Sequence, residues 1–211
     1  MKHLIIASLV ILSVNVSHGQ TKLGLKLNPA TITQRVTFQA DSSLVKKGSN
    51  SFNLSVMLFA DIGITRNYFF NTGIGYTSKR INLEYFPQYA ASSESKSYNV
   101  QYVQCPATIK LYTDEIALDK KLYFQFGPLI EVAVYDKETN QDVTIIEQFQ
   151  PIDISLLFAT GLEIQLAPQT AIQVGFNYTR GLINVAESIS EVAGGIEIKN
   201  DLYSIEVAVK F

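Results

Sequence analysis

The chain has 211 residues, of which 47% are hydrophobic and 17% charged, and its formal net charge at pH 7 is −2. This length suits one substantial domain, and the lack of a basic excess argues against a nucleic-acid partner. The single cysteine, Cys105, excludes an internal disulfide and a cysteine-based zinc cluster, while 12 Phe, 11 Tyr and many β-branched residues favour strands.

The first 19 residues have the pattern of a secretory signal peptide. A short positive start precedes an apolar run at 4–16, which is shorter than the about 20 residues that a membrane-spanning helix needs. Ser17 and Gly19 place small residues at the minus-three and minus-one positions of a cleavage site. We therefore expect a signal peptide at 1–19 and a mature domain at 20–211, and we disfavour the alternative of a retained membrane anchor.

This predicted cleavage bears on the chemistry that is open to the mature domain. Both histidines, His3 and His18, lie in the segment expected to be removed. Mechanisms that use imidazole as a base, a partner of a nucleophile or a metal ligand are then not expected. We assign no catalytic, cofactor-binding or metal-binding residue.

The mature domain divides into eight segments that read as strands. They are residues 22–36, 52–60, 68–85, 97–112, 122–135, 152–165, 170–185 and 202–211. Apolar and polar residues alternate in them, most clearly in 170–185 and in 202–211, which ends on an aromatic residue. The even number and the alternation predict an all-β fold: an eight-stranded antiparallel up-and-down transmembrane β-barrel after a cleaved signal peptide.

The connecting segments alternate between short and long. The short links are 61–67, 113–121 and 166–169, and the long ones are 39–51, 86–96, 136–151 and 186–201. Short periplasmic turns and longer external loops are typical of outer-membrane barrels. Strands of 14 to 18 residues exceed the about 9 to 11 that cross the hydrocarbon core, so we expect them to project beyond the outer leaflet.

Aromatic residues near the segment ends predict two interfacial girdles. The expected periplasmic girdle comprises Tyr68, Phe69, Tyr112, Tyr123, Phe124, Tyr203 and Phe211, and the expected external girdle comprises Tyr85, Phe86, Tyr98, Tyr102, Tyr135 and Tyr178. Pro106 and Pro128 fall inside predicted strands. We expect each to mark a β-bulge or to lie near a membrane boundary, because proline lacks a backbone N–H.

Several runs, in order and at similar spacing, carry a family resemblance. They are 24–28 (GLKLN), 102–106 (YVQCP), 110–112 (KLY), 122–128 (LYFQFGP), 161–164 (GLEI) and 176–184 (FNYTRGLIN), with Phe211 at the end. Together they resemble the PorT-like family of outer-membrane β-barrel domain proteins. The resemblance implies a small barrel of about eight strands, and the member that names the family is linked to a protein secretion system. Gln104 and Cys105 depart from the family, which more often has Glu and an aliphatic residue there.

Charged residues on the polar faces are expected to meet inside the barrel. They are Lys26, Lys79, Lys110 and Lys210, with Glu131, Asp153, Glu163 and Glu206. An eight-stranded barrel is just wide enough for side chains to fill, which predicts a mutually neutralising network rather than an ion path or ligand pocket. Glu131 with Asp153 or Glu163 is a carboxylate pair that general acid–base chemistry would require, although acids beside lysines are more often structural.

These patterns predict a small non-enzymatic barrel in the outer membrane of a Gram-negative bacterium. It would serve as a structural or interaction component of the cell envelope or, as the resemblance implies, of a protein secretion system. The expected partners are outer-membrane lipid, envelope or secretion-system proteins, and the barrel assembly machinery, which would recognise the terminal strand ending at Phe211. Two alternatives stay open: an outer-membrane enzyme without a histidine-based mechanism, and a soluble lipocalin-like barrel that binds an apolar ligand. Glycine-rich polar faces favour the membrane barrel, since exposed strand faces in soluble proteins carry longer polar residues.

Overall fold

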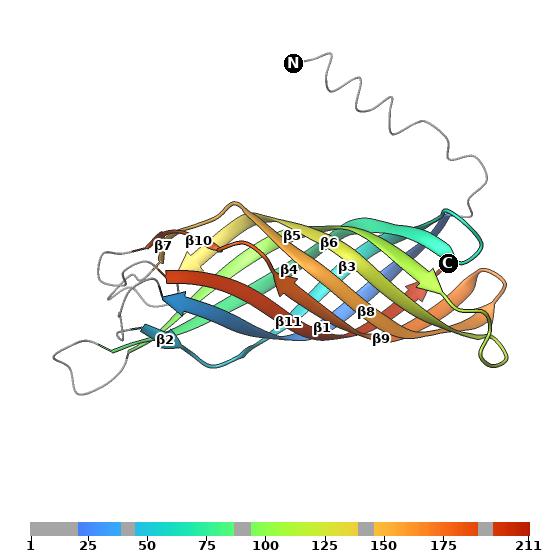
Figure 1. Cartoon of the computed structure of the whole chain (residues 1–211), viewed down its shortest axis with the longest axis horizontal. Helices are drawn as coiled ribbons and strands as arrows, with labels where there is room; N and C mark the ends of the chain where they lie inside the picture. The colour runs from blue at the N-terminus through green and yellow to red at the C-terminus, as the bar shows by residue number, and fades with distance from the viewer. Residues whose placement is uncertain (1–20, 39–44, 87–93, 139–145, 190–195) are drawn as a thin grey trace, which may run out of the picture.

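A computed structural model describes residues 21–38, 45–86, 94–138, 146–189 and 196–211. The predicted signal peptide at 1–19 lies outside these residues. The described part of the chain has no helix that is long and apolar enough to cross a membrane. Its strands wrap into one tilted barrel, with short connections and the C-terminus at one end (Figure 1). We call this the turn end. The opposite end, where β2 (Val45–Lys47), β7 (Ile146–Phe149) and β10 (Ala186–Ile189) lie, is the loop end.

Eight long strands build the barrel wall. They are β1 (Thr21–Phe38), β3 (Ser51–Gly63), β4 (Tyr68–Tyr85), β5 (Glu94–Tyr112), β6 (Lys120–Glu138), β8 (Ile152–Ala167), β9 (Thr170–Gly181) and β11 (Ile196–Lys210). Each pairs antiparallel with its neighbours in chain order, and β11 pairs with β1 to close the sheet. The eight-stranded up-and-down barrel predicted from the sequence is therefore confirmed.

Three short strands lie in links that the sequence left as loops: β2 (Val45–Lys47), β7 (Ile146–Phe149) and β10 (Ala186–Ile189). β2 pairs with the end of β4, whereas β7 and β10 form a separate two-stranded sheet. The segment predicted as one strand at 170–185 is wrong in its last part, because β9 ends at Gly181 and β10 begins at Ala186.

Side-chain burial alternates along the wall, as β3 shows. Its inward positions Ser51, Asn53 and Ser55 are buried, whereas the intervening Phe52 and Leu54 are 74% and 50% exposed. Because strand side chains point alternately to the two faces, the barrel presents an apolar outer surface around a polar lumen. This is the arrangement of a barrel surrounded by lipid. The lipocalin-like alternative, which requires an apolar lumen and a polar exterior, is wrong.

The strands are staggered as well as paired. A row of directly paired, outward-facing residues circles the barrel through Ile62, Phe70, Ile109, Phe126, Phe158, Tyr178, Tyr203, Thr31 and Phe52. It leaves β3 at Ile62 and returns to β3 ten residues away, at Phe52, so the shear number is 10. Stagger of this kind accompanies strand tilts of about 35–45°.

The two strand prolines do not mark β-bulges, which was the first of the two placements expected for them. Pairing of β5 with β4 skips Pro106 and resumes in the same register, and pairing of β6 with β5 skips Pro128 in the same way. Gly127, with φ of +151°, lets its strand approach Thr108 of β5 to a distance that a Cβ would not allow. The missing N–H groups therefore interrupt the hydrogen-bond ladder only locally. Pro106 interrupts the pairing of β5 with β4, and Pro128 interrupts the pairing of β6 with β5.

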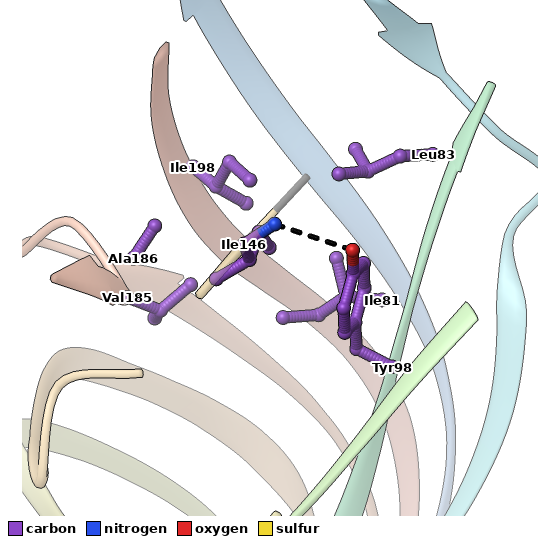
Figure 2. Close-up of a cluster of buried hydrophobic side chains, with 7 residues drawn as sticks. All are labelled: Ile81, Leu83, Tyr98, Ile146, Val185, Ala186 and Ile198. Atoms are coloured by element: carbon purple, nitrogen blue, oxygen red, sulfur yellow. Dashed lines mark hydrogen bonds between the residues drawn. The ribbon is translucent and has the colours of Figure 1, made fainter. Parts of the chain in front are cut away.

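The loop end of the lumen is filled by apolar side chains. We call them the apolar cap: Ile81, Leu83, Tyr98, Ile146, Val185, Ala186 and Ile198 (Figure 2). They come from β4, β5, β7, β10, β11 and the segment before β10. The backbone N–H of Ile146 donates a hydrogen bond of 3.2 Å to the Tyr98 hydroxyl, which ties β7 to the barrel wall. The cap thus covers the polar lumen at this end.

Candidate functional site: the charged lumen

The charged side chains that the sequence placed in the lumen all lie there. Lys26, Lys79, Lys110, Lys210, Glu131, Asp153, Glu163 and Glu206 are each at most 6% exposed. Asp61 is a further buried acid that we assigned to a short link. Its position was readable from the sequence, because Met57, Phe59 and Asp61 have the same parity along β3.

The first cluster of charges lies toward the turn end. The Lys210 ammonium forms an ion pair with Glu163 and lies 3.7 Å from the Asp61 carboxylate. The Lys110 ammonium lies 3.8 Å from the same Asp61 carboxylate. The Tyr112 hydroxyl donates to Asp61 at 3.1 Å. Two lysines thus face two acids, and the cluster is neutral.

The second cluster lies farther along the lumen, around Glu206. Lys26 donates to Glu206 at 2.9 Å, Tyr123 donates through its hydroxyl at 2.9 Å, and Asn177 donates through its amide at 3.2 Å. Lys26 also lies 4.9 Å from the centre of the Phe59 ring, within cation–π range. This carboxylate is paired and bonded on both oxygens, which is what a buried charge requires.

The third cluster contains one lysine and two acids. Lys79 lies 2.5 Å from Glu131 and 3.1 Å from Asp153, and Gln104 donates to Glu131 at 2.8 Å. Glu131 and Asp153 are direct partners in the β6–β8 ladder. The carboxylate pair considered from the sequence is thus formed by Glu131 with Asp153, whereas Glu163 lies in the first cluster.

Four tyrosines predicted for the membrane girdles face the lumen instead. Tyr98, Tyr102, Tyr112 and Tyr123 are at most 5% exposed. The girdle prediction is wrong for them because position along a strand does not fix the face. The hydroxyls of Tyr112 and Tyr123 donate hydrogen bonds to carboxylates and so take part in the charge network of the lumen. Their rings fill part of its volume.

Aromatic residues also meet on the outer surface. Ring centres lie 5.0 Å apart for Phe126 and Phe158, 6.3 Å for Phe158 and Tyr178, and 5.0 Å for Tyr178 and Tyr203. These are cross-strand neighbours on the row that defines the shear. Tyr178 and Tyr203, assigned from the sequence to opposite girdles, therefore lie side by side on the lipid-facing surface.

Little space is left inside the wall. A cavity of about 30 Å³ lies between the second and third clusters, lined among others by Lys26, Gln125, Glu131 and Asn177. A water molecule needs at least about 10–15 Å³ by this measure, so the cavity holds about one or two. Within the described ranges, no group of three or more cysteine, histidine or acidic side chains is placed to hold a metal ion.

Solved structures with the same fold are outer-membrane proteins of low sequence similarity. Neisserial surface protein A has a TM-score of 0.51 and 14% identity, over 90% of this chain and 97% of that one. OprG from Pseudomonas aeruginosa has a TM-score of 0.56 and 11% identity, over 92% of this chain and 98% of that one. AlkL, solved in lipid bilayers, has a TM-score of 0.51 and 12% identity, over 94% of each chain. At these identities the similarity establishes the fold alone.

Comparison with curated proteins gives no significant match. Residues 17–187 match the family model described as outer membrane protein beta-barrel domain. The match covers most of the chain, and the apolar exterior, polar lumen and closed eight-stranded wall agree with it. The protein belongs to the outer membrane protein beta-barrel domain family and is a small β-barrel of the outer membrane.

Proposed function

We propose that this barrel is a non-enzymatic structural or interaction component of the cell envelope, of the PorT-like kind, with envelope or secretion-system proteins as its partners. The observation that carries the proposal is the filled lumen: buried ion pairs occupy it toward the turn end and in the middle, and the apolar cap covers the loop end. Among the residues that the structure describes, such an interior offers no continuous path for solutes. The lipid-facing wall and the two rims are then the surfaces left for contact.

The loop end is the better candidate for a protein partner. β4, β5 and β6 have 18 or 19 residues, well beyond the about 9 to 11 that cross the hydrocarbon core. β2, β7 and β10 add further structure at this end (Figure 1). We assign it to the external side, because long loops of bacterial barrels are external and short turns periplasmic.

The biogenesis proposed for the chain follows the sequence pattern. Residues 1–19 direct export and are removed, and the assembly machinery recognises the terminal strand that ends at Phe211. In support, Phe211 is 58% exposed on the outer surface, and its backbone is paired with Leu23 across the closing seam. Its side chain is thus accessible while its backbone completes the barrel.

Two experiments test the proposal. Purified protein in planar bilayers should give no conductance steps, and regular single-channel steps would contradict the filled lumen. A photoreactive residue at the exposed Gln148 or Glu187 should crosslink to envelope proteins in native membranes. The same residue at Leu118, 84% exposed at the turn end, is the matched control. Equal adducts at both ends, or none at the loop end, would contradict an interaction role for that end.

A further inference from the structure

The cavity in the middle of the lumen has acceptor oxygens that no protein donor satisfies. Gln125 and Asn177 line it, each is 3% exposed, and Gln125 Oε1 and Asn177 Oδ1 have no hydrogen-bond partner. Asn28, which also lines the cavity, has an unpartnered Oδ1 as well. Buried polar atoms in native proteins nearly always have partners, so these three oxygens point to a ligand that is a donor or a cation.

The hydrogen-bond network fixes which end of the Gln125 amide is the oxygen. Asn71 donates its Nδ2 to Asp61 at 2.6 Å, which makes Asn71 Oδ1 an acceptor. Gln125 donates its Nε2 to that oxygen at 2.9 Å and to Thr108 at 2.7 Å. Exchanging the nitrogen and oxygen of Gln125 would set two oxygens against each other, so its free atom is the acceptor.

Asn177 is oriented by the same argument. Its Nδ2 donates to the carboxylate of Glu206 at 3.2 Å. A flipped amide would direct its oxygen at that carboxylate, which is unfavourable. Hydrogen bonds that lead back to two separate acids, Asp61 and Glu206, thus orient the two amides. In this orientation the amide oxygens of Gln125 and Asn177 are left without a donor at the cavity.

The third cluster, which contributes Glu131 to the cavity lining, has one more acid than lysine. Glu131 shares Lys79 with Asp153, and all three side chains are at most 1% exposed. Among the described residues the next buried lysine along β5 is Lys96. It lies four residues beyond Val100, the pairing partner of Lys79, which is about 13 Å along the strand. A buried charge without a counter-charge is costly, so this cluster requires either one more cation or a proton shared by its two acids.

We propose that the cavity binds one monovalent cation of about the size of sodium, held by Glu131 and the amide oxygens of Gln125 and Asn177. Carboxylate and amide oxygens are the ligands that hard cations take. A single charge balances the third cluster, and a volume of about 30 Å³ accommodates one small ion with at most one water. The lack of a three-residue acidic group in the described residues favours a monovalent over a divalent ion. This site is independent of any role of the loop end.

Ion-dependent stability of the full barrel in detergent micelles tests the site. Unfolding is followed by heat-modifiable gel migration in sodium chloride and in N-methylglucamine chloride at equal pH and ionic strength. Sodium should raise the midpoint, and above half-saturation of the site each tenfold rise in sodium should reduce the unfolded-to-folded ratio by up to tenfold. Equal midpoints in both salts would mean that the cavity holds water alone and would overturn the proposal.

Matched variants locate the effect. Glu131→Gln removes the excess charge and should abolish the sodium dependence, whereas Glu163→Gln, in the neutral first cluster and outside the cavity, should retain it. If Glu131→Gln does not fold, Asp153→Asn removes the same excess charge without altering the cavity lining and should weaken the sodium dependence. A midpoint that depends on pH but not on sodium in the unchanged protein would show that Glu131 and Asp153 share a proton instead.

Discussion

The hydroxyl of Tyr123 on β6 donates a hydrogen bond of 2.9 Å to Glu206 on β11, across the two intervening strands. The direct partners between them are Gly161 on β8 and Gly175 on β9. A Cβ at Gly161 or Gly175 would lie 2.6 Å or 2.2 Å from the Tyr123 hydroxyl oxygen. The tyrosine thus lies over two positions that have no side chain, and this is how it reaches the carboxylate.

Removing the Tyr123 hydroxyl and filling the glycine position should interact energetically. Tyr123→Phe should lower the free energy of unfolding by about 1.5–3 kcal/mol, the value of a hydrogen bond to a charged group. Gly175→Ala should also destabilise, and less so in the Tyr123→Phe background, because the clashing oxygen is gone. A double-mutant cycle with urea unfolding in micelles measures this, and strictly additive effects would contradict the contact. Val174→Ala, on the outer face of the same strand, is the control.

Replacing Lys79 should be among the most damaging single changes in the lumen. Lys79→Met leaves Glu131 and Asp153 buried without their counter-charge, which should cost about 3–5 kcal/mol of unfolding free energy. Adding Glu131→Gln and Asp153→Asn should recover part of the loss, since neutral amides need no counter-ion.

The control for this prediction is Lys120→Met at the exposed start of β6, expected to change stability by no more than about 0.5 kcal/mol. A similar loss in both lysine variants would show that Lys79 does not carry the charge balance of the lumen.

Cys105 provides a test of the membrane-facing surface. It is exposed on the outer face of β5, beside the interruption at Pro106 and opposite Ile130. In reconstituted vesicles an apolar maleimide should modify it, while a charged methanethiosulfonate reagent should not, because lipid covers this face.

For comparison, Gln148→Cys in a Cys105→Ser background places the thiol at the exposed loop end and should react with both reagents. Rapid reaction of Cys105 with the charged reagent in vesicles would show that lipid does not cover this face of β5.

Deleting Phe211 should impair membrane insertion more than export across the inner membrane. The deletion removes the exposed aromatic side chain and the two backbone hydrogen bonds, of 2.8 and 3.2 Å, between Phe211 and Leu23 at the closing seam. Heat-modifiable migration in outer-membrane fractions reports insertion, and the periplasmic level of unfolded chain reports export. Phe211→Tyr, which keeps an aromatic ring and the backbone bonds, should insert normally. Normal assembly of the deletion variant would contradict a role for this residue in recognition.

The wall of the barrel was largely predictable from sequence because strand faces have a period of two. Alternation identified eight strands and assigned residues such as Lys26 and Glu206 to the lumen. It failed at strand boundaries: Asp61 was assigned to a link rather than to β3, and the strand predicted at 170–185 extended past the end of β9 at Gly181. It also failed where aromatic residues were placed by height along a strand rather than by face, as for Tyr112 and Tyr123.

The sequence by itself thus determined the strand number, the polar lumen and the acids and lysines that occupy it, since these follow from local periodicity. Only the tertiary structure decided which of them meet, because contacts across the lumen depend on the stagger of all eight strands. Lys79 meets Glu131 and Asp153, and Tyr123 reaches Glu206, at sequence separations of 52, 74 and 83 residues. The apolar cap likewise joins Ile81, Ile146 and Ile198, which no local pattern relates. A shear of ten residues around a closed wall is the physical reason that these groups face one another.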